Sequence, residues 1–123
     1  MEDLLLCESD FKLMDIIWEN SPVESGRLVK LCEEQLNWKK STTYTMLRKL
    51  CGKGLVQNND TVVTYLVPRS KIQRQESRYL VERSFKGSIP AFMSAFLGKG
   101  KISQEEAKEL MDLIADHTEK EKT

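Results

Sequence analysis

The stretch that most constrains the fold lies between Trp38 and Gly54. Its apolar positions recur with the i, i+3, i+4 and i+7 spacing of an amphipathic helix, at Thr43, Met46, Leu47 and Leu50. The opposite stripe carries hydroxyls and cations without a carboxylate, at Ser41, Tyr44, Thr45, Arg48 and Lys49. A helix face of donors and cations suits the phosphates and base edges of a nucleic acid. The alternative is an ordinary packed helix with a solvated basic side.

The charges of the chain are unevenly distributed. The formal net charge of the 123 residues is zero, which by itself would argue against a nucleic-acid binder, because phosphate neutralisation dominates affinity. However, residues 1–24 hold seven acids and one base, residues 39–86 hold eleven bases and three acids, and residues 101–123 hold seven acids and four bases. A basic block between two acidic ones points to an anionic partner.

Other residue types argue against several functional classes. The cysteines Cys7, Cys32 and Cys51 form no CxxC pair. Cys32 and Cys51 fall on predicted apolar faces, so we interpret them as core residues, with thiol sensing as the alternative. We expect no cofactor and no metal. No apolar run approaches the roughly 20 residues of a membrane span and no signal segment opens the chain, which predicts a cytoplasmic protein without membrane insertion.

The sequence also lacks a catalytic constellation. Its single histidine, His117, lies in a charged tail, where solvation is the simplest interpretation. Glu105, Glu106 and Glu109 read as the acidic first turn that a helix dipole favours. Gly-rich phosphate loops, HExxH and GxSxG do not occur. We therefore expect that the protein is not an enzyme.

The residues before Trp38 predict two further helices. The first contains the apolar run Phe11–Trp18 and begins at Cys7 or Ser9, of which Ser9 is the better N-cap. The second follows Ser25 and carries an amphipathic pattern at Leu28, Val29, Leu31, Cys32 and Leu36. Two helices joined by a short turn, the second with a polar and cationic face, match a helix-turn-helix.

After Gly54 the hydrophobic period becomes that of strands. Residues 55–57 and 61–67 are rich in β-branched and aromatic types and bracket residues 58–60, Asn-Asn-Asp, which tolerate the left-handed conformation of a hairpin turn. Three helices followed by a hairpin predict a winged helix with the hairpin as its wing. The predicted fold is mainly α with a small β-hairpin: a winged helix-turn-helix at residues 1–69, followed by a helical dimerisation region at residues 70–123.

The C-terminal region predicts helices that cannot form a compact core alone. A long helix is expected after Ser70 as N-cap, and Ser103-Gln-Glu-Glu106 is a capping box. The apolar residues of the short segment 91–97 have too few partners in one chain, so we predict burial against a second copy in a symmetric homodimer. Packing onto the winged helix is the alternative. The predicted interface consists of Ile72, Tyr79, Leu80, Phe92, Met93, Phe96, Leu97, Leu110 and Ile114.

Several motifs recur in a known order over residues 7–115. They are Phe11-x-Leu-Met-x-Ile-Ile-Trp18, Ser21-Pro22, Trp38-x-x-Ser-Thr-x-Tyr-Thr-x-Leu-Arg-x-Leu50, Lys53-Gly-Leu55 and Ser103-Gln-Glu-Glu106. With them the chain resembles the penicillinase-repressor (BlaI/MecI/CopY) family. The third motif is specific, because other winged-helix groups do not combine it with such a C-terminal tail. The resemblance implies a dimeric repressor on a pseudo-palindromic operator that silences resistance or stress-response genes.

The resemblance also implies functional residues. The family's recognition helix maps onto Lys40–Lys53. Together with helical spacing, this predicts contacts to double-stranded operator DNA from Lys39, Lys40, Ser41, Thr42, Tyr44, Thr45, Arg48 and Lys49. In antibiotic-responsive members a sensor-linked protease cuts the short helix after the first dimer helix, and the equivalent bond joins Ala95 to Phe96.

The chain departs from the family pattern at three places. The family usually has a serine N-cap where Lys39 stands, and an asparagine where Ala95 stands. Copper-responsive members carry a cysteine-rich C-terminal motif, whereas no cysteine follows Cys51. Copper sensing by that route is therefore not expected. The competing functional interpretation is a winged-helix protein–protein adaptor without sequence-specific DNA binding, which would usually show acids or apolar anchors on the third helix.

Overall fold

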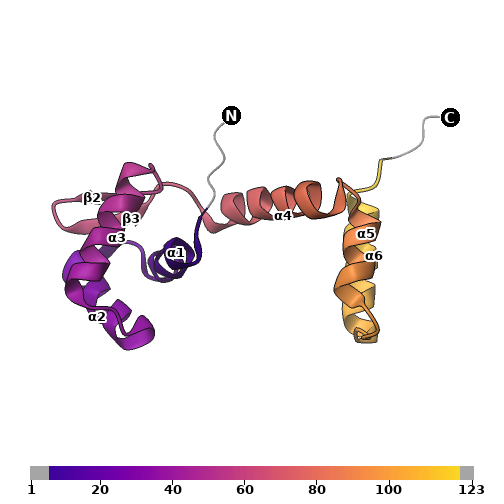
Figure 1. Ribbon diagram of the computed structural model, residues 1–123, viewed down its shortest axis with the longest axis horizontal. Helices are drawn as coiled ribbons and strands as arrows, with labels where there is room; N and C mark the ends of the chain where they lie inside the picture. Colours follow the sequence, from indigo (N-terminus) through magenta and orange to yellow (C-terminus); the bar gives the residue numbers. More distant parts are fainter. Residues whose placement is uncertain (1–5, 120–123) are drawn as a thin grey trace. The chain divides into compact units, whose positions relative to one another are not determined.

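The computed structural model describes residues 6–119, which form six helices and three short strands (Figure 1). In chain order these are α1 (Glu8–Asn20), β1 (Val23–Glu24), α2 (Ser25–Leu36), α3 (Lys40–Gly52), β2 (Val56–Asn59), β3 (Val62–Tyr65), α4 (Arg69–Phe85), α5 (Ile89–Leu97) and α6 (Gln104–Asp116). The chain divides into two compact units, Met1–Leu80 and Val81–Thr123, so the division falls inside α4. No helix among residues 6–119 combines the length and apolar character needed to cross a membrane.

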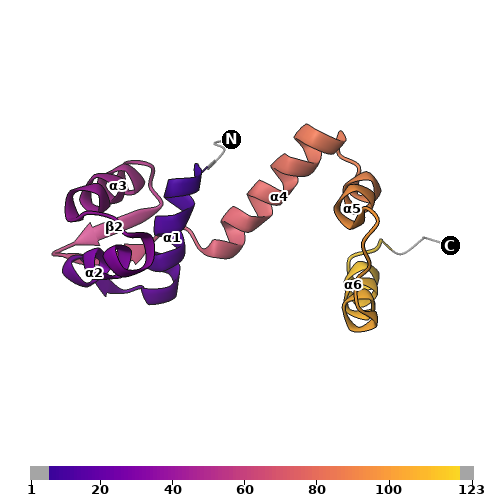
Figure 2. The same cartoon turned by 60° about the horizontal axis from the view of Figure 1, so that its bottom comes forward.

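The first unit is a winged helix, as the sequence predicts. Figure 2 shows α1, α2 and α3 grouped around a small antiparallel sheet of strand order β1-β3-β2. Its core consists of apolar side chains from all three helices and the sheet, among them Leu13, Met14, Ile17, Leu28, Leu50, Leu55 and Val63, each without solvent exposure. The apolar period of each helix therefore faces one shared core.

Helix α1 begins two residues earlier than its best capping residue would suggest. Its N-cap is Cys7 and not Ser9, which lies inside the helix. The cause is Asp10, whose carboxylate Oδ2 accepts a hydrogen bond from the backbone N–H of Cys7 at 3.3 Å. A carboxylate that satisfies an N-terminal N–H stabilises the helix start, so the quality of the cap residue itself matters less.

The wing hairpin is present, but its turn lies later than the predicted residues 58–60: Asn58 and Asn59 belong to β2, and β3 ends at Tyr65 instead of Val67. Strand pairs run from Val56–Tyr65 to Asn59–Val62, leaving a two-residue turn at Asp60 and Thr61 with φ of 52° and 67°. Thr61, expected to open the second strand, therefore lies in the turn. A β-branched residue is rare at positive φ, and here the carbonyl of Thr61 accepts a hydrogen bond from the backbone N–H of Ser25 at 2.8 Å.

Val23 and Glu24 form a third strand, β1, which pairs with β3. The register places Val23 opposite Val63 and Glu24 opposite Val62. Val23 is buried and Glu24 is exposed, which is the alternation expected of a strand with one face on a core. The sheet therefore closes against the start of α2, an arrangement that a hairpin prediction does not include.

Helix α4 begins at Arg69, one residue before the predicted capping position of Ser70. The carbonyl of Pro68 accepts hydrogen bonds from the N–H groups of Lys71 and Ile72, at 3.1 and 3.4 Å, which closes the first turn. Ile72 has no solvent exposure and belongs to the core of the winged helix. Its assignment to a dimer interface is therefore wrong, because the first turn of α4 folds onto the first unit and its apolar side chain completes that core.

The second unit contains α5, α6 and the end of α4. Ser88 and Ser103 cap α5 and α6: their hydroxyls accept hydrogen bonds from the N–H groups of Ala91 and Glu106, both at 3.0 Å. The second of these confirms Ser103 as the N-cap of α6, which is one half of the predicted capping box. Among described residues 81–119, none is buried. This unit presents its apolar side chains to solvent instead of to a core of its own.

Candidate nucleic-acid interface

A defined turn connects α2 to α3. Asn37 adopts the left-handed conformation, with φ of 57°. The N–H of Asn37 donates to the carbonyl of Glu33 at 3.1 Å, and the N–H of Trp38 donates to the carbonyl of Cys32 at 3.3 Å. This pattern satisfies the last carbonyls of α2 and reverses the chain. The turn holds the start of α3 in a fixed direction, as a helix-turn-helix requires.

The inner face of α3 is the stripe that the sequence predicts. Thr43, Leu47 and Leu50 are buried, and Met46 is half-buried against the same core. The hydroxyl of Thr43 donates back to the carbonyl of Lys39 at 3.4 Å, which satisfies this polar group in the core. The orientation of α3 about its own axis is therefore set by packing.

The outer face of α3 consists of donors and cations. Ser41, Thr42, Thr45 and Arg48 are exposed, and so are Lys39 and Lys40 at the start of the helix. Lys39 is the N-cap and its side chain makes no capping hydrogen bond. The first turn also contains no acid. The N–H groups of that turn and the two lysines beside them are hydrogen-bond donors at one end of the outer face. Such a group of donors can bind a phosphate.

Two of the predicted contact residues differ from the rest in their surroundings. Tyr44 is half-buried and packs against the core. Lys49 points to α1, where its ammonium lies 3.1 Å from Oδ1 of Asp10. Lys53, one turn later, donates to Oδ2 of the same carboxylate at 2.9 Å. A buried acid thus holds the C-terminal end of α3 onto α1.

Sequence reasoning did not find this acid. Asp10 and Lys53 are 43 positions apart, and an acid in the first turn of a helix is ordinarily explained by the helix dipole. Asp10 has no solvent exposure, whereas the side chains of Lys49 and Lys53 are 44% and 36% exposed. Burial acts to raise the pKa of Asp10, but hydrogen bonds from Lys53, Cys7 and Lys49 outweigh it and lower the pKa to about 2 from 3.8.

We expect the stability of the winged helix to fall in acid because of Asp10. A carboxyl whose pKa is lowered by folding contributes its stability above its unfolded pKa and loses it as pH falls through the folded value. The contribution of about 2 kcal/mol should therefore be present above pH 4 and decline toward pH 2. Urea unfolding as a function of pH measures it. Asp10→Asn should flatten the dependence in this range, while Asp60→Asn, at an exposed turn carboxylate, should leave it unchanged.

The wing adds little positive charge. Residues 56–65 contain no lysine or arginine, and their one ionisable acid is Asp60 at the tip. A wing of this composition offers amide and hydroxyl donors but cannot neutralise phosphates. The wing therefore adds no cation to those that flank and line the outer face of α3.

The cysteines lie in three environments. Cys32 is buried and Cys51 is half-buried, both against the core as predicted, and burial raises the pKa of each thiol. Cys7 is exposed, and its pKa is lowered, first by its hydrogen bond with Ser9. In residues 6–119, no group of His, Cys, Asp or Glu side chains is arranged to hold a metal ion.

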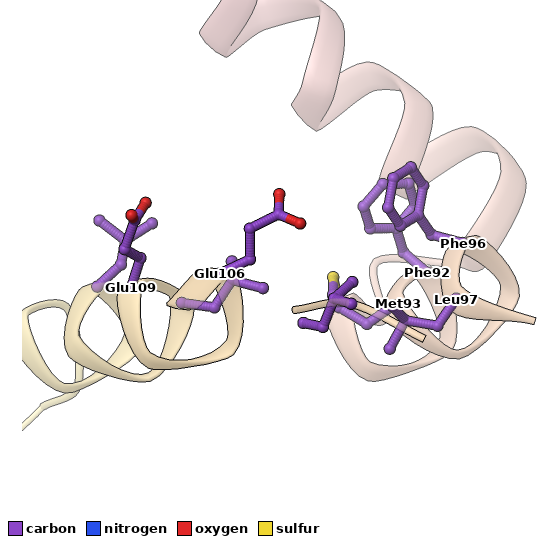
Figure 3. Close-up of a pocket in the computed structure, with 9 residues that line it drawn as sticks. Phe92, Met93, Phe96, Leu97, Glu106 and Glu109 are labelled. Carbon is purple, nitrogen blue, oxygen red and sulfur yellow. The ribbon is translucent and has the colours of Figure 1, made fainter. Parts of the chain in front are cut away.

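The second unit carries an apolar cleft between α5 and α6, of about 370 Å³ (Figure 3). Its lining is Phe92, Met93, Phe96, Leu97, Ile102, Glu106, Glu109, Leu110 and Leu113. The rings of Phe92 and Phe96 lie side by side with centroids 6.0 Å apart, and Phe85 meets Phe92 edge-on at 5.5 Å. Phe96 is 71% exposed. An exposed aromatic group of this kind marks an interaction surface.

The remaining residues predicted for the dimer interface lie outside any core. Tyr79, Leu80 and Ile114 are exposed. Ala95 and Phe96, the predicted cleavage position, are exposed on α5. Among the nine predicted interface residues, Ile72 alone is buried in the chain itself.

The chain is similar over most of its length to known proteins. A family model described as penicillinase repressor matches residues 6–116. The penicillinase repressor of Bacillus licheniformis is 23% identical over 121 residues, covering 95% of this chain and 94% of that protein. The methicillin resistance regulatory protein MecI of Staphylococcus aureus is 23% identical over 113 residues, covering 89% and 92%, as is that of Mammaliicoccus sciuri.

Proposed function

The chain belongs to the penicillinase repressor family, whose members are transcription regulators and not enzymes, and from this premise we propose that it is a homodimeric repressor of pseudo-palindromic operator DNA. It would act in the cytoplasm on resistance or stress-response genes. The names of its relatives, a penicillinase repressor and a regulator of methicillin resistance, support this choice of target class.

The observation that carries the proposal is the acid-free outer face of α3. Arg48 and Tyr44 would approach base edges, with Thr45, one turn before Arg48, on the same side of the helix. Ser41, Thr42, Lys39 and Lys40 would bind phosphates near the start of the helix. Lys49 and Lys53 are partly neutralised by Asp10, so their part in phosphate binding is smaller. An adaptor surface would instead require apolar or acidic anchors on this face.

The second unit supports the dimeric part of the proposal. None of its described residues is buried. Four of its large apolar side chains are each more than half exposed: Phe96, Met111, Leu113 and Ile114. So many exposed apolar side chains require a partner surface to cover them. In a dimer with a two-fold axis, the same surface of a second copy covers them, so no other protein is needed. A two-fold protein would read two half-sites of an operator.

Cleavage and dimerisation would compete for one residue. Phe96 belongs both to the proposed interface and to the Ala95–Phe96 bond that the family resemblance assigns to a sensor-linked protease. In the proposed dimer this side chain would be covered. A protease would therefore act on the opened dimer, and a cut in α5 would remove part of the surface that closes it.

We expect Arg48→Ala and Lys40→Ala to weaken DNA binding in different ways. Loss of a base contact by Arg48→Ala should cost about 1–3 kcal/mol on the operator, roughly 5- to 150-fold, and little on random DNA. Lys40→Ala should weaken operator and random DNA alike and reduce the salt slope by about one. Fluorescence anisotropy with DNA from upstream of its own gene, at low and moderate salt with random competitor, measures both.

The same titration, together with nuclease footprinting of the same DNA, tests the proposed function itself. Saturable binding that declines steeply with salt and yields two footprints one helical turn apart is the expected result. Binding without preference over random DNA at every salt concentration would contradict it and favour the adaptor. Unchanged operator affinity in Arg48→Ala would contradict the assignment of the base-contacting face.

A further inference from the structure

The first turn of α4 is attached to α1 by a cluster of side chains that the DNA-binding face does not use. Figures 1 and 2 show the beginning of α4 next to α1. We name this cluster, which consists of Asp15, Trp18, Glu19 and Arg69, the Arg69 clasp. All four residues lie in the first unit.

The tryptophan holds the backbone just before α4. The indole N–H of Trp18 donates to the carbonyl of Val67 at 2.9 Å. Its ring meets Phe11 edge-on, with centroids 5.7 Å apart, and the guanidinium carbon of Arg69 lies 5.2 Å from the ring centroid. The ring is therefore fixed by an aromatic neighbour, a hydrogen bond and a cation over its face.

The arginine is held by two carboxylates of α1. Its Nη2 donates to Oδ1 of Asp15 at 2.5 Å and to Oε1 of Glu19 at 3.0 Å. Asp15 and Glu19 are four residues apart and so lie on one face of α1. The hydrogen bonds that Arg69 donates to Glu19 and to Asp15 raise the pKa of its guanidinium, and the Arg69 side chain is only 33% exposed. A planar guanidinium held at two acceptors and a ring face has little rotational freedom.

The same helix, α1, also holds α3. At its N-terminal end Asp10 binds Lys49 and Lys53 of α3, and at its C-terminal end the Arg69 clasp binds the start of α4. Helix α1 therefore acts as a spacer that fixes the recognition helix and the departure of α4 relative to each other. Both connections are made within the first unit.

Small changes at the root of α4 are amplified by its length. The part of α4 that belongs to the first unit, residues 69–80, spans about 18 Å at 1.5 Å per residue. A tilt of about 10° at the root would move the end of this part by about 3 Å, which is close to the roughly 3.4 Å rise of one base pair. Two recognition helices that must meet two half-sites at a set separation cannot tolerate such an error.

We propose that Arg69 is a positioning residue that sets the half-site spacing read by the repressor, by fixing the direction in which α4 leaves the winged helix. This inference rests on the proposed dimeric repressor. It assigns a role in operator specificity to a residue that would not touch DNA. It also separates two properties of binding. The first is the affinity of one winged helix for one half-site, and the second is the agreement between the distance separating the two winged helices and the distance separating the two half-sites.

The test compares spacing profiles of the full-length protein. Wild-type protein first selects its preferred duplex from random-sequence DNA. The probes are that duplex, versions with the half-sites moved apart or together by one and two base pairs, and a single half-site. Wild type should lose about 10-fold or more in affinity at two base pairs, whereas Arg69→Ala should lose less than about 3-fold across the series and keep its half-site affinity.

Three further variants control the test. Arg74→Ala removes an exposed cation from the same helix outside the clasp and should keep the wild-type profile. Arg69→Glu should flatten the profile, because it places a carboxylate beside those of Asp15 and Glu19. Trp18→Phe keeps an aromatic ring, removes the N–H bonded to Val67, and provides a second route to the clasp if Arg69→Ala fails to fold.

Each outcome decides between the proposals. If Arg69→Ala keeps the sharp spacing profile of wild type, the positioning role is overturned, while the proposed repressor function stands. Trp18→Phe decides the same question if Arg69→Ala does not fold. Equal weakening of every duplex, including the single half-site, would mean a general structural role and would also overturn it. Failure of wild-type protein to select paired half-sites would instead contradict the proposed function.

Discussion

Phe96→Glu should convert the proposed dimer into a monomer and lower the affinity for an operator with two half-sites at least about 100-fold, because the two winged helices would no longer be linked. The side chain is 71% exposed in the single chain and stacks beside Phe92 at the mouth of the α5–α6 cleft. Burying a phenylalanine is worth about 1.5–3 kcal/mol. In a two-fold dimer each protomer contributes one Phe96, so this burial energy is lost twice. Each glutamate would also lose its hydration if it entered an apolar interface.

Sedimentation velocity at micromolar concentration measures the oligomeric state of Phe96→Glu. Tyr65→Glu, which places the same charge at an exposed aromatic position of the winged helix, is the matched control for oligomeric state and should remain dimeric. Affinity for a single half-site should be unchanged in Phe96→Glu, because the first unit is untouched. A variant that still sediments as a dimer would show that α5 does not form the interface.

Leu50→Ala should destabilise the winged helix by about 2–5 kcal/mol, the range for removing a fully enclosed leucine from a core. Leu50 has no solvent exposure and lies on the inner face of α3, in the cluster shared by α1, α2 and the sheet. The surrounding helices are held by the turn at Asn37 and by Asp10, so they cannot collapse freely into the cavity. The cost should therefore exceed that of the transfer of the lost methylenes alone.

Tryptophan fluorescence in urea measures this loss in the first unit alone, because both tryptophans, Trp18 and Trp38, lie there. Leu66→Ala, at a leucine that is 52% exposed, should change the free energy of unfolding by less than about 1 kcal/mol. A loss of that small size in Leu50→Ala would contradict the packing of α3 onto the core. The direction of its outer face would then have no structural basis.

The local features of this protein could be predicted from short stretches of sequence. The buried residues Thr43, Leu47 and Leu50 follow from the period of one helix, and the cap at Ser103 follows from four consecutive residues. Such features depend on side chains within one or two turns of each other, so neighbouring residue types are sufficient to specify them. The candidate DNA-binding face follows in the same way, because it is the opposite side of a helix whose inner side is known.

Features that short stretches of sequence left open or placed wrongly depend on residues far apart in the chain. Cys7 serves as N-cap because Asp10 is held in place by Lys49 and Lys53 from another helix. Thr61 accepts positive φ where its carbonyl meets the N–H of Ser25. In both cases a local preference, for a better cap or for a strand, is outweighed by contacts that form only when the helices and the sheet come together.

The sequence by itself determined the kinds of elements, their order and the face of α3 that is free to meet a partner. The tertiary structure alone decided which side chains connect those elements: Ile72 to the first core, Asp10 to α3, and Arg69 to α1. The physical reason is distance along the chain. Periodicity reports which side of a helix is apolar, whereas the partner of a charge or of an apolar side chain 40 or more positions away is chosen by packing of the whole unit.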